Sequence, residues 1–155
     1  MTRMTVRIEG SRVVLGGRID DSAQLGELAA KLPPGDVAID TDAVTFVNSI
    51  GMRELIRLVR ALRGAGRRVA LERVADVLIT QVNMLPELAE SVTVTSFHAQ
   101  YACPSCGAEH APLVDVAAHA QLLRRNAAPP LPCPECGKPS ELADFPERYL
   151  SIFKA

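Results

Sequence analysis

The sequence predicts an α/β fold over residues 1–97, followed by a small cysteine-bearing module over residues 98–155. Two observations support this division. Apolar residues alternate between strand-like and helix-like spacing along the first part, and all four cysteines lie after residue 102. Strand and helix patterns that alternate along a chain indicate a layered α/β fold. The boundary between the two parts is expected between Ser96 and Tyr101.

The first part begins with a predicted β-hairpin. Val6 and Ile8 alternate with polar residues, a turn signal follows at residues 9–11, and residues 12–15 return as a second strand. Two alternating runs separated by a short turn that contains glycine are typical of a hairpin.

Seven further elements follow from apolar periodicity and from the turns between them. Short apolar runs indicate buried strands, and apolar residues three and four positions apart indicate helices. The residues Asp20-Asp21-Ser22 can cap the first helix, and two prolines and a glycine at residues 33–35 end it. We expect helices over residues 23–32, 49–62 and 75–83, and strands over residues 37–39, 44–47, 68–71 and 92–95.

Composition and charge exclude several classes of protein. Hydrophobic residues make up 48% of the chain and aromatic residues only 4%, so the core is expected to be aliphatic. Lys and Arg number 12 against 12 Asp and Glu before Cys103, and five against six from there on, so neither part is a basic module. No secretory signal follows the first residues, and no apolar run approaches the roughly 20 residues of a membrane span. We therefore expect a cytoplasmic protein, in which paired cysteines more often bind metal than form disulfides.

The four cysteines lie in two copies of one motif, C-P-x-C-G, at residues 103–107 and 133–137. Two thiolates separated by two residues can chelate one ion from a tight turn, and the following glycine lets the backbone bend. Two such knuckles supply four thiolates, which suits a tetrahedral Zn²⁺ in a zinc ribbon. A full thiolate shell leaves no position for water, so the zinc is expected to be structural. The predicted ligands are Cys103, Cys106, Cys133 and Cys136.

Two alternatives to zinc stay open at this point. Four thiolates do not by themselves choose the metal, so iron is the main competitor. Two redox C-x-x-C motifs are the other alternative, although proline and glycine in matching places favour metal. The gap of 26 residues between the cysteine pairs, from residue 107 to 132, is longer than the commonest spacing. The three histidines are expected to be surface or packing residues because four cysteines already fill the shell.

Three segments of the first part carry a family resemblance: GRID at residues 17–20, DVAID at 36–40 and VTFVNSIGM at 44–52. Together they resemble the STAS domain, the family named for sulfate transporters and anti-sigma factor antagonists, over roughly the first 97 residues. The resemblance implies a mixed β-sheet packed against helices on one side. In antagonist members it also implies partner switching: the protein binds an anti-sigma kinase, is phosphorylated in the turn before a helix, and releases the kinase.

By this resemblance, Ser49 is the candidate phosphoacceptor and Gly51 matches the family's glycine. Asn48 stands where the family has Asp, so a constitutive binder is an alternative to a phosphorylated switch. Independently of the family, Ser49 lies where a strand gives way to a helix, which is a good N-cap position. A phosphate there would meet free N–H groups at the positive end of the helix dipole. The alternative is that Ser49 serves only as a helix cap.

The helix after Ser49 carries Arg53, Arg57 and Arg60 on one face. In proteins that the chain resembles, this helix and the preceding turn contribute to the partner surface, and a basic face would suit an acidic partner. A solvated arginine face is the alternative. The predicted partner-binding residues are Asn48, Ser49, Gly51, Arg53, Arg57 and Arg60.

These observations favour a non-enzymatic bacterial signalling protein that binds an anti-sigma-type kinase or a related partner, with the zinc ribbon as a second interaction surface. The alternative is a zinc-ribbon regulator that binds nucleic acid, but the module lacks a basic run interleaved with aromatic residues. An enzyme is not expected. The sequence shows no nucleophile–base pair, no glycine loop for phosphate and no open metal site that bears histidine.

Overall fold

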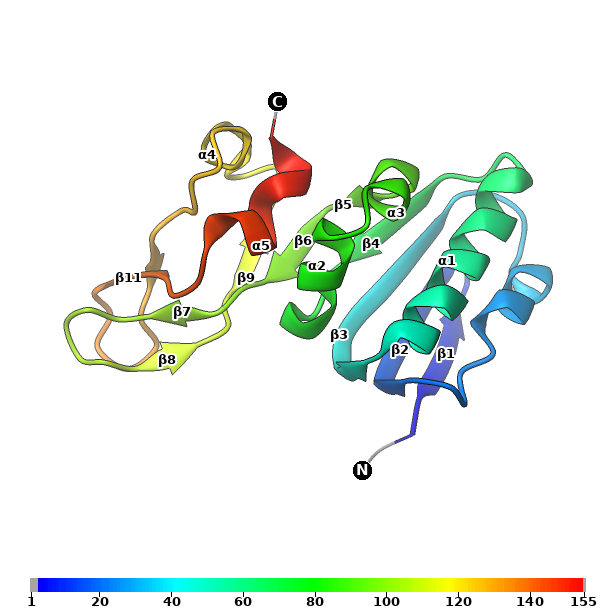
Figure 1. The fold of residues 1–155 in the computed structure, drawn as a ribbon, viewed down its shortest axis with the longest axis horizontal. Helices are drawn as coiled ribbons and strands as arrows, with labels where there is room; N and C mark the ends of the chain where they lie inside the picture. Colours follow the sequence, from blue (N-terminus) through cyan, green and yellow to red (C-terminus); the bar gives the residue numbers. More distant parts are fainter. Residues whose placement is uncertain (1–2, 155) are drawn as a thin grey trace.

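The structure, a computed structural model, describes residues 3–154 (Figure 1). Its largest unit is a five-stranded sheet in the order β1-β2-β3-β4-β5. The first pair is antiparallel and the other neighbours are parallel, so the sheet is mixed. The strands are β1 Thr5–Glu9, β2 Arg12–Ile19, β3 Val37–Val47, β4 Val69–Glu72 and β5 Thr93–Val94.

Three helices accompany this sheet: α1 Ser49–Gly64, α2 Asp76–Asn83 and α3 Pro86–Ser91. Figure 1 shows α1 and α2 lying over the same face of the sheet. Strand residues alternate between faces, and those under the helices, such as Leu15, Ile39 and Leu71, are fully buried. The core is aliphatic, as the composition predicts. The sequence-based prediction of an α/β fold is therefore confirmed.

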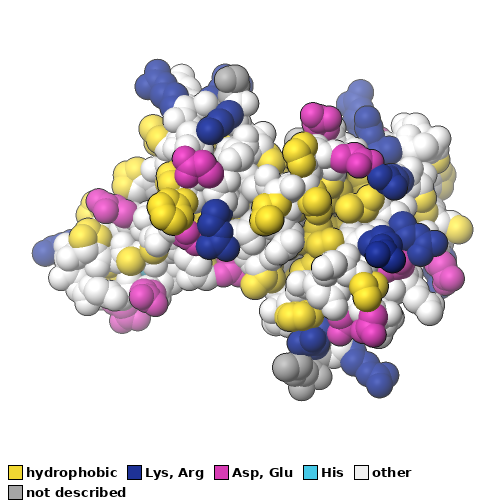
Figure 2. All heavy atoms as spheres, in the orientation of Figure 1, with side chains coloured by type: hydrophobic (Ala, Val, Ile, Leu, Met, Phe, Trp, Pro, Cys, Tyr) yellow, Lys and Arg dark blue, Asp and Glu magenta, His cyan; other side chains and the backbone are white. Residues whose placement is uncertain are grey.

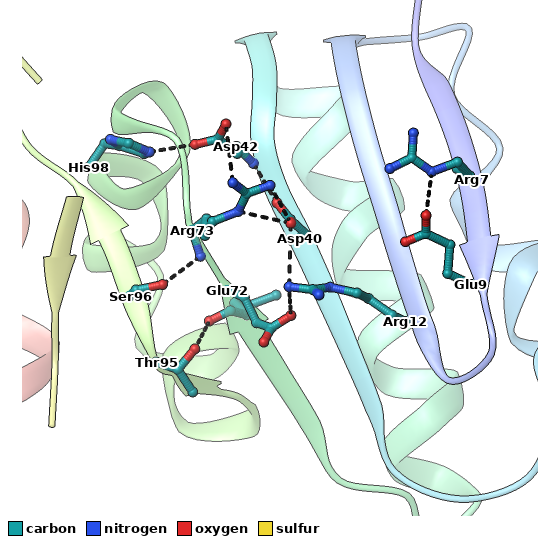
Figure 3. Close-up of polar contacts among 11 residues, drawn as sticks. Arg7, Glu9, Arg12, Asp40, Asp42, Glu72, Arg73, Thr95, Ser96 and His98 are labelled. Carbon is teal, nitrogen blue, oxygen red and sulfur yellow. Dashed lines mark hydrogen bonds and ion pairs between the residues drawn. The ribbon is translucent and has the colours of Figure 1, made fainter. Parts of the chain in front are cut away.

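The opposite face of the sheet carries charged residues (Figure 3). Asp40, only 2% exposed, accepts hydrogen bonds from the Nε and Nη2 atoms of Arg73 at 3.0 and 2.8 Å. The Nη2 atom of Arg12 lies 3.6 Å from the same carboxylate and 2.8 Å from Glu72. The backbone of Arg73 has a φ of 46°, a left-handed conformation uncommon for a residue with a side chain. These ion pairs tie three neighbouring strands together.

The second part contains smaller sheets and short helices. One sheet has two strands and the other has four, in the order β10-β11-β7-β8. The two-stranded sheet pairs β6 Ser96–His98 with β9 Leu113–Asp115. The remaining elements are β7 Tyr101–Ala102, β8 Glu109–His110, α4 Ala120–Arg124, β10 Leu131–Pro132, β11 Pro139–Leu142, α5 Pro146–Leu150 and the 3-10 helix η2 Ser151–Phe153.

The end of the second part returns to the first part. The ring of Phe153 stacks on that of Phe97 with the ring centres 5.2 Å apart. The N–H of Ile152 donates to the Asn83 Oδ1 atom at 3.0 Å, next to α2. His98 spans the two parts, with Nε2 at 2.5 Å from the Asp42 carboxylate and Nδ1 at 2.8 Å from a carbonyl oxygen of the second part. Side chains on both sides of residue 97 thus share one core.

Most predicted elements of the first part appear in the structure. The hairpin is β1 and β2, the helix expected over residues 49–62 is α1, and that over residues 75–83 is α2. The strands expected over residues 68–71 and 92–95 are β4 and β5. Sequence reasoning missed α3, whose six residues begin at a proline.

The α-helix expected over residues 23–32 is wrong in type. The structure has a 3-10 helix, η1 Leu25–Lys31, with no side-chain cap. The residues expected to cap it bond to each other instead: Asp20 Oδ1 accepts from the N–H and the hydroxyl of Ser22 at 3.0 and 2.7 Å. Those contacts close a local turn and leave the helix start without its cap.

The sequence predicts two strands, over residues 37–39 and 44–47, with a turn between them at Thr41-Asp42. That turn is wrong, because β3 runs from Val37 to Val47 without a break. Against β2, the register moves from Val14 opposite Asp40 to Gly16 opposite Ala43, so β3 carries one extra residue there. This is a β-bulge, and the Asp42 N–H donates to Asp40 Oδ1 at 3.0 Å within it. Polar residues that suggested a turn instead mark a bulge in a continuous strand.

Within residues 3–154, no helix combines the length and the apolar character that crossing a membrane requires.

Candidate functional site

Each C-P-x-C-G motif forms a tight turn that presents two sulfurs. In the first knuckle, the N–H of Gly107 donates to the carbonyl of Cys103 and the N–H of Cys103 donates to that of Ala108, both at 2.8 Å. The same two bonds recur at residues 133–138, at 2.9 and 2.8 Å. The φ angles of Gly107 and Gly137 are 78° and 77°, which residues with a Cβ rarely adopt. The glycine after each cysteine pair is therefore required by the turn.

The two knuckles bring the four cysteine sulfurs into one cluster. All four Sγ atoms lie within 4.8 Å of one another, and the structure contains no disulfide among them. The first cysteine of each motif is buried and the second is exposed. A set of four thiols this close, drawn from two turns, could hold one metal ion. The predicted ligands Cys103, Cys106, Cys133 and Cys136 are therefore all brought together.

Backbone N–H groups favour the thiolate form of Cys103, one of the two buried cysteines. The N–H of Cys106 makes the largest contribution to a lowered pKa of the Cys103 thiol, which falls to about 6, and the N–H of Ser105 adds to it. In the second knuckle the N–H of Glu135 donates to Cys133 Sγ at 3.4 Å. Because the thiolate is the form that ligates metal, the lowered pKa of Cys103 favours a bound cation. The N–H of Ala108 acts to lower the pKa of Cys106, but neighbouring thiols and partial burial outweigh it and raise that pKa to about 12. The N–H of Lys138 is outweighed in the same way, so the pKa of Cys136 is also raised.

The histidines make other contacts. His110 Nε2 lies 2.8 Å from the hydroxyl of buried Ser140, which itself donates to the carbonyl of Leu131 at 2.7 Å. That chain joins three strands of the four-stranded sheet. Among the described residues, the cluster that could hold a metal contains cysteines alone. Buried Tyr101 supports the same sheet by donating to a carbonyl at 2.6 Å, and burial raises the pKa of its phenol to about 12.

The reduced, freshly purified protein should carry about one metal ion per chain, held by the four cysteines. The reason is that four thiols converge within one coordination sphere. Elemental analysis of the purified protein, normalised to protein concentration, gives the stoichiometry and the identity of the metal. Reduced protein with no bound metal would contradict this expectation.

The start of α1 is the second candidate site. Asn48 is the N-cap: its Oδ1 accepts the N–H of Gly51 at 2.8 Å, and its backbone is extended. The prediction that Ser49 caps the helix is therefore wrong. Asn ranks with Ser as a cap, and here the residue before the helix takes that role. Ser49 is instead the first helical residue, and it is exposed.

The close approach of α1 to the end of β2 explains Gly51. A Cβ on this residue would lie 1.9 Å from the carbonyl oxygen of Ile19 and 2.5 Å from its carbon. The N–H of Asn48 donates to the same carbonyl at 3.3 Å. Only glycine fits there without a shift of the backbone, so it fixes how the turn bearing Ser49 sits on the sheet.

Gly51→Ala should lower the free energy of unfolding by about 1–3 kcal/mol, because backbone atoms must move to admit the methyl group. Gly64→Ala is the matched control in the same helix, since a Cβ there meets nothing within 4 Å. The control should be neutral or stabilise by up to about 1 kcal/mol through helix propensity. Urea unfolding of both variants measures the difference, and equal stability of the two would contradict the steric role of Gly51.

The three arginines predicted to bind a partner differ in their surroundings. Arg57 pairs with Glu54 at 2.9 Å, and Arg60 pairs with Glu87 of α3. Arg53 has no ion pair within the described chain and is exposed. It follows Ser49 by one helical turn, so its guanidinium is the free cation nearest in sequence to that hydroxyl.

Comparison with models of known protein families finds none that matches this chain, and comparison with curated proteins finds no matching sequence. Together, the fold and the site define a mixed α/β protein with a four-cysteine cluster that could hold a metal.

Proposed function

We propose that this protein is a non-enzymatic signalling protein that binds a regulatory partner through residues around Ser49. In this proposal the first part acts as a STAS-like domain whose partner is an anti-sigma-type kinase or a related protein. The cysteine cluster is a structural zinc ribbon that offers a second interaction surface. The observation that carries the proposal is the exposed Ser49 at the first position of α1, beside its Asn48 cap.

The architecture supports the STAS-like interpretation. That family has a mixed sheet with helices on one side, and here a mixed five-stranded sheet has α1 and α2 over one face (Figure 1). The segments on which the resemblance depends lie together in space, since Ile19 at the end of β2 contacts Asn48 and Gly51 at the start of α1.

The position of Ser49 suits a switch that works by charge. The first N–H groups of a helix have no partner within it, and the dipole favours an anion there. A phosphate on Ser49 would add about −1.5 to −2 charges, and Arg53 lies one turn away to pair with it. The same charge, placed in an interface, would have to be desolvated when a partner binds. Phosphorylation would therefore favour release of the partner.

The choice of zinc follows from the donor set. Four thiolates from two short turns suit tetrahedral Zn²⁺, and a closed shell leaves no position for a reacting water. Iron in the same ligands is the competing assignment. The metal's role here is to hold the two knuckles together, since the module buries few large apolar side chains around it.

Ser49→Asp and Ser49→Glu should weaken binding to the partner by at least about tenfold, while Ser49→Ala should preserve it, because a negative charge at the interface must be desolvated. Asn48→Asp restores the family's carboxylate and keeps an N-cap acceptor, so it should raise phosphorylation by an anti-sigma-type kinase. Phosphate incorporation and affinity are measured on wild type, Asn48→Asp and Ser49→Ala with the same purified kinase.

The controls separate a phosphorylated switch from a structural residue. Ser49→Ala should incorporate no phosphate at this position, and Thr45→Asp adds the same charge to an exposed residue of β3 that precedes the turn. Equal affinity for all Ser49 variants, with no phosphate in wild type or Asn48→Asp, would make Ser49 a structural residue and the protein an unswitched adaptor.

A further inference from the structure

The four cysteines of the cluster differ in exposure and pair across the two knuckles, which a purely structural metal site does not require. Two close sulfur–sulfur contacts run between the knuckles: Cys103 Sγ lies 3.6 Å from Cys136 Sγ, and Cys106 Sγ lies 3.6 Å from Cys133 Sγ. Each of these pairs joins one buried and one exposed cysteine. Cys103 and Cys133 are 2% and 3% exposed.

The place of the cluster leaves the exposed cysteines open to small reagents. Figure 1 shows the β7–β8 turn and the strand β11 at one end of the molecule, away from α1 and its neighbours. The two residues between the cysteines of each motif, a proline and the residue after it, are exposed as well, so no other element covers the tips of the knuckles.

We propose that the cluster is also a redox modification site for hydroperoxides, in which Cys106 and Cys136 are oxidised first and their buried cross-knuckle partners complete two disulfides. This inference gives the metal-holding cluster a second role, reaction with hydroperoxides, and it does not depend on the proposed role of Ser49. Forming each bond closes a sulfur–sulfur distance of 3.6 Å to about 2.05 Å, and the two sulfurs already face each other.

The electrons and atoms balance with hydrogen peroxide as the oxidant. The thiolate of Cys106 attacks one peroxide oxygen, the O–O bond breaks, and a sulfenic acid and a hydroxide result. The thiolate of Cys133 then attacks the sulfenic sulfur, the S–S bond forms, and a second hydroxide leaves. Each disulfide thus gives two electrons to one peroxide, and Cys136 with Cys103 repeats the sequence. Two peroxides therefore consume all four thiolates and leave a divalent cation without ligands.

The difference in exposure also assigns the order of events. In the metal-bound cluster every ligating cysteine is a thiolate, so exposure decides the order. An exposed cysteine meets the peroxide first, and a buried partner within reach resolves the sulfenic acid before a second peroxide can oxidise it further. The two contacts of 3.6 Å between the knuckles lead us to expect cross-knuckle disulfides in place of disulfides within one knuckle. The product is a module cross-linked between the β7–β8 turn and the β10–β11 turn in place of its metal.

The test treats the metal-loaded full-length protein with increasing hydrogen peroxide and follows released metal with a chromogenic chelator. Tryptic peptides are mapped in parallel by mass spectrometry. Arg124 and Arg125 lie between the knuckles, so trypsin separates the two cysteine pairs unless a cross-knuckle disulfide joins them. We expect complete release of the metal at two peroxides per cluster. We also expect joined peptides whose fragments assign Cys103–Cys136 and Cys106–Cys133, and full reversal by dithiothreitol.

Met84→Leu is the control variant, because Met84 is 72% exposed and is a competing target for oxidation. It should release metal as wild type does. Retention of the metal at tenfold excess peroxide would overturn the inference, as would sulfinic acids without disulfides or disulfides confined to single knuckles. Reduced protein that never carries metal would instead contradict the metal centre, and disulfide mapping then still decides whether the cysteines pair across the knuckles.

Discussion

Removing the metal with a chelator should unfold the cysteine-bearing module while most of the helical signal remains. Metal binding supplies about 10–16 kcal/mol of apparent free energy in small zinc modules, which is more than so small a core could replace. Helices α1, α2 and α3 contain 16, 8 and 6 residues, whereas α4 and α5 contain five each. The helical signal in far-ultraviolet circular dichroism should therefore fall on chelation only by the smaller share that α4 and α5 contribute.

The packing of the C-terminal segment sharpens this expectation. Tyr149 and Leu150 of α5 are buried, and Phe153 stacks on Phe97, so this segment contacts the first part directly. It should stay attached after the knuckles open, and hydrogen exchange should show lost protection at residues 101–142 but retained protection in α1 and α2. Zn²⁺ added back to the reduced protein is the control and should restore the signal. A complete, cooperative loss of structure on chelation would show that both parts form a single unit.

The regular elements of the first part could be predicted because short-range sequence patterns determine them. The apolar spacing of α1 agrees with its burial, and so do the buried Val13 and Leu15 of β2. In β1 the alternation predicted the strand, although Val6 and Ile8 are 39% and 40% exposed. The knuckles were equally predictable, since a duplicated C-P-x-C-G motif encodes its own turn. All four sulfurs meet although 26 residues lie between Cys106 and Cys133.

The errors arose where polar side chains choose between several backbone partners. The polar residues Thr41 and Asp42 suggested a turn. In the structure Asp40 accepts the Asp42 N–H inside a β-bulge, and the bulge is recognised only from the register of β3 against β2. Ser49 is a residue type that often caps helices, but Asn48 directly before it caps at least as well, and its Oδ1 accepts the capping hydrogen bond.

Long-range ion pairs had no sequence signal at all. Asp40 and Arg73 are 33 residues apart, and the segment at residues 36–40 that ends in Asp40 gave no sign of a partner for its carboxylate. The contacts of the chain's end with α2, such as the bond of Ile152 to Asn83, likewise depend on how the two parts meet. Sequence reasoning could therefore place the cysteine cluster and the Ser49 turn, and it could not see the charged face of the sheet.

Asp40→Ala should lower the free energy of unfolding by about 3 kcal/mol. Removing one partner of a buried ion pair costs about 3–5 kcal/mol because the other charge stays behind, and the lower end applies here since both guanidiniums can reach water. The side chains of Arg12 and Arg73 are 44% and 46% exposed, against 3% for Asp40. The hydrogen bond with Asp40 is also the largest cause of a raised pKa of Arg73.

Two further variants identify the source of that loss. Glu9→Ala breaks the ion pair between Arg7 and Glu9 on the same face, whose side chains are 68% and 49% exposed (Figure 3), and should cost less than about 1 kcal/mol. Arg73→Gly removes the other partner of Asp40 but relieves the left-handed backbone, so it should cost less than Asp40→Ala.

Urea unfolding of the three variants with the metal bound gives the comparison. Figure 2 shows charged side chains scattered among apolar ones on the face that bears the helices, where no exposed pair is expected to contribute as much. A loss for Asp40→Ala no larger than that for Glu9→Ala would mean that the buried carboxylate contributes no more than an ordinary surface charge. In that case the three strands would be held by their backbone ladders and aliphatic core alone. The expected difference of about 2 kcal/mol, from the contrast between a buried and an exposed pair, is well above the error of such measurements.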